Sequence, residues 1–241
     1  MSLITFSNKS DGDAQWISVS DLMAGLMMVF LFIAVIYAKD ADSRAKNVTE
    51  IVNEWQDSEL EIYRALEREF KDDLPMWNAE IDRDSLTIRF LSPEILFKAG
   101  KAELTDKFKT VLDDFMPRYI DLLISRFDTK IDEVRIEGHT SSEWSSSASE
   151  SEAFIRNMQL SQARTRTVLE YSISMTGTQY FTPWMIKRVG AHGLSSARLI
   201  MREGVEDKKR SRRVEFTIKT KTKEAMFRIL DRISPAVEKS F

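Results

Sequence analysis

An uncharged run from Leu22 to Ala38 is the feature that most constrains what this chain can form. Its 17 residues lie at the short end of what crosses a hydrocarbon core, and a start at Ile17 gives 22 residues, which at about 1.5 Å of rise each span roughly 30 Å. The run is longer than the apolar region of a secretory signal peptide, and acidic residues outnumber basic ones before it. We therefore expect an uncleaved transmembrane helix over 16–38.

Asp21 lies at the beginning of this run, and its position has two interpretations. In the first, Asp21 is the N-cap of the helix, where its carboxylate accepts a backbone N–H at the level of the lipid headgroups. In the second, the helix begins near Trp16, an interfacial aromatic anchor, and Asp21 is an intramembrane acid. An unpaired charge at mid-membrane costs about 2.5–3.5 kcal/mol, so such an acid is protonated or faces a partner or water. The residues of the helix alone leave both interpretations open.

Helical spacing places Asp21 on a stripe of small residues that becomes apolar further along. The members follow steps of three and four, and they are Ser18, Asp21, Gly25, Met28 and Phe32. Small residues in membrane helices let a neighbouring helix approach closely. We therefore expect Ser18 and Gly25 to be helix-packing positions near the acid.

The segment after Ala38 is charged, and it contains neither Pro nor Gly before Pro75. Large apolar residues recur in it at helical steps, at Ile51, Trp55, Ile62, Leu66 and Phe70. The pattern predicts a helix that continues out of the membrane over 39–75, as a self-associating stalk or as a connector that lies along the membrane. A solvated linker is the alternative, although it does not explain the aromatic residues on one stripe.

The composition argues against several classes of protein. The chain has 35 Lys and Arg against 38 Asp and Glu, with a net charge of −3, which does not favour nucleic-acid binding. It has no Cys and only two His, so neither disulfides nor a structural zinc site is expected. There is no Ser-His-Asp order and no cluster of metal ligands in the sequence. We expect no enzyme, no metal and no cofactor.

The pattern beyond Pro75 predicts one folded domain at 76–241. Alternating apolar residues predict strands, helical periodicity predicts helices, and a segment rich in Ser and Glu predicts a loop. Strands alternating with helices indicate an α/β sandwich in which the helices cover one side of a small sheet. The predicted strands are 85–90, 131–137, 186–190 and 211–219, the helices are 104–127, 152–174 and 224–237, and the loop is 141–152.

Four short motifs between positions 95 and 220 carry a family resemblance. They are Leu96-Phe97 with Gly100 and Leu104-Thr105, a strand ending Gly138-His139-Thr140, a helix opening Asn157-Met-Gln-Leu160-Ser161-Gln-Ala-Arg164, and a strand beginning Arg212-Arg213-Val214-Glu215. Together they resemble the OmpA-like peptidoglycan-binding domain. The fold implied is a single N-terminal transmembrane helix with a helical extension, followed by an α/β OmpA-like sandwich domain.

The resemblance also implies a site, because this family binds the carboxylates and the amine of the peptide stem of peptidoglycan. Arg164 would hold a carboxylate through two N–H donors. Thr140, Asn157 and Leu160 would shape the pocket, while Arg213 would flank it or support the fold.

Two positions depart from the family pattern. Ser141 stands where the family has an Asp after His-Thr, and Ser211 stands where it has an Asn before Arg-Arg. The loss of the Asp removes the partner of the stem's ammonium group, and Glu143 is the nearby acid that would replace it. Arg212 would flank the pocket or support the fold, and a structural hydrogen-bonding role is expected for His139.

The membrane segment resembles that of the B subunits of ion-driven stator motors, the MotB type. The pattern is an aromatic residue, an Asp, a Met two residues on and a Phe nine residues on, here Trp16, Asp21, Met23 and Phe30, with Met27 between. Within this class the run is most similar to the ZorB branch, the B subunits of the Zorya anti-phage system. The resemblance favours the intramembrane acid, with Asp21 carrying protons.

The same resemblance implies partners and a topology. It implies a homodimer inside a pentameric ring of MotA-like (ZorA-like) subunits, attachment to peptidoglycan, and cytoplasmic defence effectors that act through the ring, with no direct contact to nucleic acid. Residues 1–15 would be cytoplasmic, 39–75 would have the position of a plug, and the C-terminal domain would be periplasmic in a single-pass protein of the inner membrane. The basic residues Lys39, Arg44 and Lys46 follow the span, and by the positive-inside rule they favour a cytoplasmic C-terminal domain. The implied binding to the cell wall outweighs this weak preference and favours a periplasmic domain. The alternatives are a flagellar-type stator subunit and a membrane-tethered cell-wall anchor without ion transport.

Overall fold

The computed structural model describes residues 11–91, 93–98, 100–145, 147–221 and 227, without the side chains of 11–18, 47, 51, 54, 55, 93 and 94. The chain divides into two compact units, one formed by Glu54–Met226 and the other by the remainder of the chain. The predicted helix over 224–237 lies outside the described residues, apart from Phe227. The described elements confirm a long apolar helix followed by an α/β domain.

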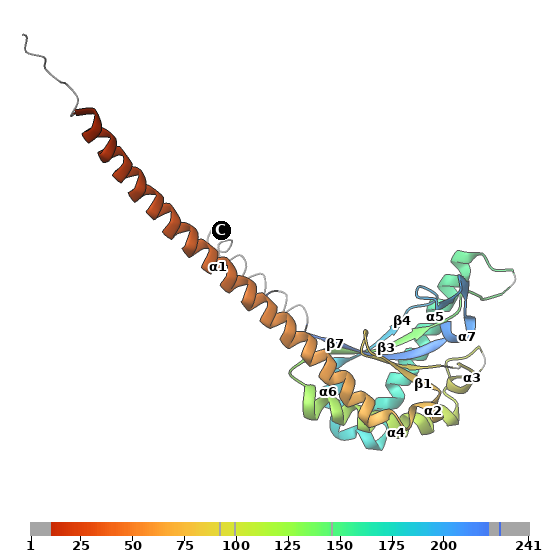
Figure 1. Cartoon of the computed structure of the whole chain (residues 1–241). Helices are drawn as coiled ribbons and strands as arrows, with labels where there is room; N and C mark the ends of the chain where they lie inside the picture. The colour runs from red at the N-terminus through yellow and green to blue at the C-terminus, as the bar shows by residue number, and fades with distance from the viewer. Residues whose placement is uncertain (1–10, 92, 99, 146, 222–226, 228–241) are drawn as a thin grey trace, which may run out of the picture. The chain divides into compact units, whose positions relative to one another are not determined.

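Helix α1, Asp11–Phe70, is continuous over 60 residues (Figure 1). This confirms the helix predicted across the apolar run and its charged extension. The helix begins ten residues before Asp21, and only the first four N–H groups of a helix lack a partner in the preceding turn. Asp21 is therefore too far inside the helix to be its N-cap, and that interpretation is wrong.

The apolar part of α1 is exposed along its length. The segment Val19–Glu50 is long and apolar enough to cross a membrane, with a mean hydropathy of 2.4 over its most apolar window and none of that window buried in the chain. Leu22 is 75% exposed, and Tyr37, at the other end of the run, is 72% exposed. Soluble proteins rarely leave so large a contiguous apolar surface in water. This surface fits a single-pass membrane helix that lipid or a partner covers.

The second unit contains a five-stranded sheet with the order β1-β2-β7-β3-β4. Strands β3 and β4 are parallel, and the other neighbouring pairs are antiparallel. Along β7 the residues Val214, Phe216 and Ile218 enter the apolar core, as the period of two in a strand requires. The bounds are β1 Ala79–Asp82, β2 Thr87–Phe90, β3 Ile131–His139, β4 Val189–Gly193 and β7 Arg213–Thr220.

Two long helices, α4 Asp106–Phe127 and α5 Glu150–Ser174, pack on one face of this sheet (Figure 1). Helix α4 starts where Thr105 accepts a hydrogen bond from the N–H of Phe108, which is an N-cap. Its buried stripe brings Phe115 to 5.0 Å from Phe216 of β7, measured between ring centroids. The remaining elements are α2 Leu74–Trp77, α3 Pro93–Leu96, η1 Thr176–Phe181, α6 Thr182–Arg188, the hairpin β5 Met201–Arg202 with β6 Val205–Glu206, and α7 Lys208–Ser211.

The last turns of α1 belong to the core of the second unit. Ile62, Leu66 and Phe70 are all 0% exposed, and the ring of Phe70 lies 5.3 Å from that of Phe115. The compact unit consequently begins at Glu54 and not at the expected boundary of 76, because this stripe is buried against α4. The final part of the expected connector at 39–75 is therefore part of the domain.

Three parts of the sheet region differ from the sequence-based expectation. Strand β1 and the hairpin β5–β6 were not expected, since both are short and lack a run of alternating apolar residues. The strand expected at 186–190 is wrong over its first half, where 186–188 continue α6 and the strand starts at Val189. Pro183 in the first turn explains this helix, because its fixed φ suits that position.

Phe70→Ala tests whether the end of α1 stabilises the domain. The deletion leaves a cavity in the aromatic core, so we expect the free energy of unfolding to fall by about 3–5 kcal/mol. The measurement is urea unfolding of the full chain in mild detergent, followed by near-UV circular dichroism. The control is Arg64→Ala on the exposed side of the same helix, which should change stability by less than about 0.5 kcal/mol. Equal effects of the two substitutions would contradict this packing.

Candidate functional site

Helix α5 lies unusually close to strands β3 and β4, because two glycines leave room for it. A Cβ added at Gly138 would lie 2.7 Å from Cγ2 of Thr165 and 2.9 Å from the carbonyl oxygen of Ser161. A Cβ added at Gly193 would lie 2.3 Å from the backbone nitrogen of Gln162. Any larger residue at either position would push the helix away. The two glycines therefore fix the position of the helix that carries most of the expected site residues.

Asn157 joins α5 to the loop that follows β3. Its side chain is buried, and Nδ2 donates to the carbonyl oxygens of Ser141 at 3.2 Å and Glu143 at 3.0 Å. Beside this contact, the N–H of Thr140 donates to the carbonyl oxygen of Ser195 at 2.9 Å. The family resemblance predicts Thr140 and Asn157 in one pocket, and the structure brings their two segments together.

Arg164 lies on the same face of α5 as Asn157 and the half-buried Leu160, since the three are spaced at helical intervals. It is 9% exposed. Its Nε donates to the carbonyl oxygen of Lys101 at 3.0 Å, and the guanidinium centre lies 4.8 Å from the ring centroid of Phe97. Among the described side chains, no carboxylate forms an ion pair with Arg164. The guanidinium is therefore held in place while its remaining donors are available to a ligand.

Arg164 also has an unusual electrostatic environment. Burial is the main cause that lowers its pKa, and the positive charge of Arg212 lowers it further, to about 10. The group stays protonated at pH 7. Nε of Arg212 is itself buried and without a hydrogen-bond partner among the described residues. Among the described side chains, no carboxylate forms an ion pair with Arg164 to offset these positive charges, which favours an anionic ligand.

Arg213 has a different role from its neighbour. Its Nε donates to Oε1 of Glu215 at 2.7 Å, and its Nη1 donates to the carbonyl oxygens of Ser211 at 2.9 Å and Arg198 at 3.2 Å. These contacts use its donors inside the chain. Of the two roles expected for Arg213, this arrangement favours support of the fold, and contact with a ligand stays a prediction.

The acids near the loop after β3 already form ion pairs or hydrogen bonds within the chain. Glu143, expected as the replacement for the family's Asp, forms an ion pair with Lys208 on the surface. Glu206 accepts from the backbone N–H of Ser142 at 3.0 Å and from its hydroxyl at 2.5 Å. The loop is therefore tied to strand β6 of the hairpin and to α7, and the carboxylate of Glu143 already has a cationic partner.

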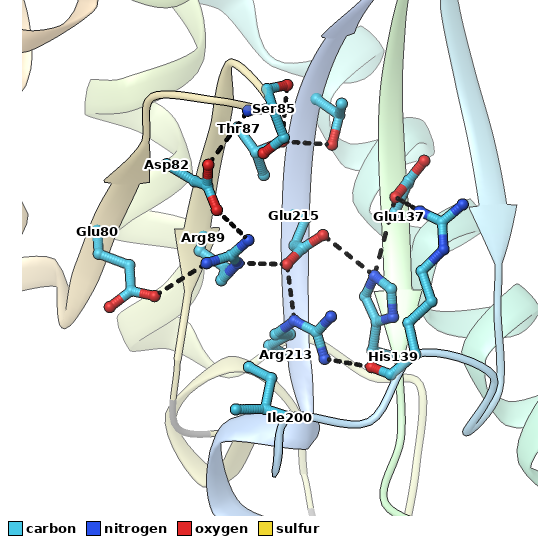
Figure 2. Close-up of polar contacts among 12 residues, drawn as sticks. Glu80, Asp82, Ser85, Thr87, Arg89, Glu137, His139, Ile200, Arg213 and Glu215 are labelled. Carbon is cyan, nitrogen blue, oxygen red and sulfur yellow. Dashed lines mark hydrogen bonds and ion pairs between the residues drawn. The ribbon is translucent and has the colours of Figure 1, made fainter. Parts of the chain in front are cut away.

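The sheet face opposite the helices carries a chain of ion pairs (Figure 2). Oε1 of Glu215 accepts from Nε of Arg89 at 2.5 Å and from Nε of Arg213 at 2.7 Å. Arg89 in turn contacts Asp82 at 2.8 Å and Glu80 at 3.2 Å. Burial alone would raise the pKa of Glu215, but the close contacts with His139 and with the guanidinium of Arg213 hold it far below its ordinary value. These pairs join three neighbouring strands.

His139 lies in the same network. Its Nε2 is 3.3 Å from Oε2 of Glu215 and 3.9 Å from Oε2 of Glu137, as the dashed lines in Figure 2 show. These three residues offer ligand atoms within 4.8 Å of one another, as a metal site would. However, Arg198 contacts Glu137 at 3.3 Å, and two further arginines contact Glu215. Because these guanidinium charges already neutralise the carboxylates, the arrangement favours a structural role for His139 over metal binding. The hydrogen bonds expected for that role are not found, since both ring nitrogens are buried without a hydrogen-bond partner among the described residues.

The membrane acid is exposed within its own chain. Asp21 is exposed, and a Cβ added at Gly25 would meet nothing within 4 Å. The side chain of Ser18 lies outside the described residues. The expected contact of this stripe with a neighbouring helix therefore stays a prediction.

Three residues around Arg164 could not be assigned to its surroundings from the sequence. Phe97 belongs to the Leu-Phe motif and lies against the guanidinium of Arg164, and the positive charge of Arg212 contributes to the lowered pKa of Arg164. Lys101 contributes a backbone carbonyl, for which no side-chain pattern exists. The Leu-Phe motif was the single signal that pointed to this part of the site.

The comparison with curated proteins decides the family. The chain is 44% identical over 213 residues to Zorya protein ZorB of Escherichia coli (strain ATCC 8739), and the alignment covers 88% of this chain and 90% of that protein. The chain belongs to the ZorB family. In addition, residues 96–213 of this ZorB-family chain match the OmpA family. The matched region contains the loop after β3, helix α5 and the arginines described above.

Two solved structures are similar to the ZorB-family chain. One is the cell wall anchor of the T6SS from Pseudomonas aeruginosa, with 22% identity, a TM-score of 0.45, and coverage of 65% of this chain and 97% of that one. The other is a putative MotB like protein from Desulfovibrio vulgaris, with 22% identity, a TM-score of 0.47, and coverage of 72% and 99%.

The network around His139 predicts a pH dependence for the stability of this ZorB-family chain. Burial is the main cause that lowers the pKa of His139, so the unfolded chain takes up its proton first as the pH falls through about 6.5. Stability from this group is complete above that pH and is lost below it, by up to about 1.4 kcal/mol between pH 7.5 and 5.5. Urea unfolding at both pH values, well above the titration of Glu215, measures the change.

His139→Gln should reduce that pH dependence, because Gln does not titrate. The matched control is His192→Gln, a half-exposed histidine 3.0 Å from Glu133 on the same sheet, which should leave the contribution of His139 intact. The idea fails if His139→Gln preserves the full difference between the two pH values.

Proposed function

We propose that this ZorB-family chain is the stator-like B subunit of a Zorya complex, which anchors to peptidoglycan and carries protons through Asp21. The observation that carries the proposal is that Asp21 lies ten residues inside an apolar helix whose far end is part of an OmpA-family domain. A carboxyl group that takes up and releases protons produces force only if something holds the chain in place. Wall attachment by the domain supplies that hold.

The proposed wall contact is a carboxylate of the peptide stem bound by Arg164. The guanidinium is fixed by Lys101 and Phe97 and has no acid partner among the described residues. A planar guanidinium presents two parallel N–H donors to a carboxylate, and burial strengthens the resulting charge-assisted hydrogen bonds. Thr140, Asn157 and Leu160 shape the surroundings, as the family resemblance implies. This chemistry binds a ligand and catalyses nothing.

The proposed proton step depends on the free-energy cost of placing a charged carboxylate in an apolar environment. Protonation removes the charge of Asp21 and lets the helix slide past a neighbouring subunit, and release of the proton restores the charge and the contact. Each proton that crosses 100 mV supplies about 2.3 kcal/mol. Small residues such as Gly25 let the neighbouring helix approach closely enough to sense this change.

The proposed assembly follows from these two sites. A wall-bound domain is periplasmic, so residues 1–15 are cytoplasmic and the chain crosses the inner membrane once. Two copies of the chain would stand inside a pentameric ring of MotA-like (ZorA-like) subunits, with an Asp21 from each copy facing the ring. The ring would act on cytoplasmic defence effectors against phage. A flagellar-type motor would use the same parts for motility.

Asp21→Asn tests the proton step. We expect loss of phage protection and of proton conductance across vesicles that contain the complex, because Asn cannot titrate. Assembly and wall binding should persist. The control is Asp40→Asn, an exposed acid after the apolar run that pairs with Arg44 at 2.8 Å. A protein that is only a tethered anchor would keep full activity with Asn at position 21, and a motility defect without loss of phage protection would indicate the flagellar alternative.

Arg164→Ala tests the wall contact. Removal of one partner from a desolvated, charge-assisted pair costs about 2–5 kcal/mol, so co-sedimentation of the detergent-solubilised chain with purified cell-wall sacculi should weaken by at least about 30-fold. The control is Arg166→Ala, whose side chain is 78% exposed two residues along the same helix. Unchanged sedimentation of the Arg164 variant would refute the proposed contact.

A further inference from the structure

The loop between β3 and α5 carries an exposed tryptophan, Trp144, whose side chain is 42% exposed. The other tryptophans with described side chains have partners inside the domain. Trp77 is buried in the aromatic core, and Nε1 of Trp184 donates to Asp128 at 2.6 Å. No hydrogen-bond partner for Nε1 of Trp144 is found among the described residues. A single exposed aromatic residue does not make a site, so the surroundings of Trp144 decide what it can do.

The backbone on both sides of Trp144 is held in place. Before it, the carbonyl oxygen of Glu143 accepts from Nδ2 of Asn157 at 3.0 Å. After it, the carbonyl oxygen of Ser145 accepts from the N–H of Ala148 at 3.2 Å. A side chain on a backbone that is already ordered loses less conformational freedom when a ligand binds. The indole is therefore both exposed and preorganised.

The groups around the indole suit an uncharged, hydroxyl-rich ligand. The neighbouring acid, Glu143, is already paired with Lys208. Ser145 and Ser147 are exposed, and their hydroxyl oxygens lie 3.4 Å apart. A pyranose sugar presents C–H groups on its faces and hydroxyl groups at its rim. The negative face of an aromatic ring attracts such C–H groups, and serine hydroxyls can donate to or accept from those of the sugar.

The distance along α5 places this loop where the sugar of a bound stem would lie. Asn157, which holds the carbonyl before Trp144, precedes Arg164 by about two turns, or about 10 Å at 1.5 Å per residue. An extended peptide covers about 3.3–3.6 Å per residue, so about three residues span this distance. In peptidoglycan the stem is attached by one end to the glycan strand. A stem held at Arg164 that runs towards Asn157 therefore brings its sugar to the loop.

We propose that Trp144 stacks on a sugar ring of the glycan strand, as a second contact to peptidoglycan beside the contact to the stem. The proposal rests on the proposed wall binding and specifies its ligand: the domain recognises the sugar and the stem together. Intact wall, in which a stem carries its sugar, is therefore bound more tightly than a free stem peptide.

The test compares two soluble ligands, a stem peptide that carries its disaccharide and the same stem without it. The full chain in mild detergent is titrated with each ligand in a calorimeter. We expect the unsubstituted chain to bind the ligand with the sugar at least about fivefold more tightly, because one stacked ring is added. Trp144→Ala should bind the two ligands within about twofold of each other, because the ring is absent.

Each other result of the titrations has a definite meaning. An unsubstituted chain without a preference for the sugar would overturn the proposal and leave stem binding intact. A Trp144→Ala chain that keeps the preference would overturn the assignment of Trp144. Lack of binding of either ligand to the unsubstituted chain would refute the proposed wall binding itself.

Co-sedimentation with purified sacculi gives an independent readout. Trp144→Ala should bind at least about fivefold more weakly, and Trp144→Phe, which keeps an aromatic face, should stay within about twofold of the unsubstituted chain. The control is Tyr180→Ala, which removes an aromatic side chain that is 90% exposed on η1 and should not change binding. A Phe variant as weak as the Ala variant would rule out stacking. If Trp144→Ala does not fold by circular dichroism, Trp144→Leu, which is apolar but not aromatic, takes its place.

Discussion

The close contact of α5 with β3 and β4 is the constraint on which the candidate site depends. Gly138 and Gly193 let the helix backbone approach the sheet to a distance that a Cβ would prevent. At this distance Asn157 reaches the carbonyls of the loop after β3, and Ser195 donates through its backbone N–H to the hydroxyl of Ser161 at 3.1 Å. The position of Arg164 is therefore set by backbone packing and does not depend on a bound ligand.

The two sides of the sheet differ in whether their buried charges have partners of opposite sign. On the face shown in Figure 2, arginines and acids from neighbouring strands form ion pairs, and buried carboxylates such as Glu215 remain ionised because guanidinium groups contact them. Around Arg164 no described acid fulfils that role. In a structural network each buried charge is paired with a charge of opposite sign inside the protein. A buried charge without such a partner is a reason to expect a ligand. The contrast also explains why Arg212 and Arg213, although adjacent in sequence, have different roles.

Much of this architecture could be predicted from periodicity and motif spacing. The long helix, the two covering helices and the central strands follow from apolar patterns of period 3.6 or 2, and the family motifs led to Asn157 and Arg164. The parts that could not be predicted lack such patterns. Strand β1 has four half-buried residues, and the Lys101 contact is made by a backbone carbonyl.

The domain boundary was also missed, for a physical reason. A stripe that contains Ile62, Leu66 and Phe70 has the same period whether it packs on another copy of the chain or on its own domain, and only the folded structure distinguishes the two. For Asp21, sequence alone left a helix cap and an internal acid equally acceptable, and the start of α1 at Asp11 excluded the cap.

The burial of the end of α1 has a mechanical consequence. Because Ile62, Leu66 and Phe70 are embedded among the aromatic rings that also join α4 to β7, a force applied to these last turns of α1 acts directly on the centre of the domain. If the domain binds the cell wall as proposed, the wall contact and the core of the domain bear the load in series, so the weaker of the two sets the largest force that the attachment withstands.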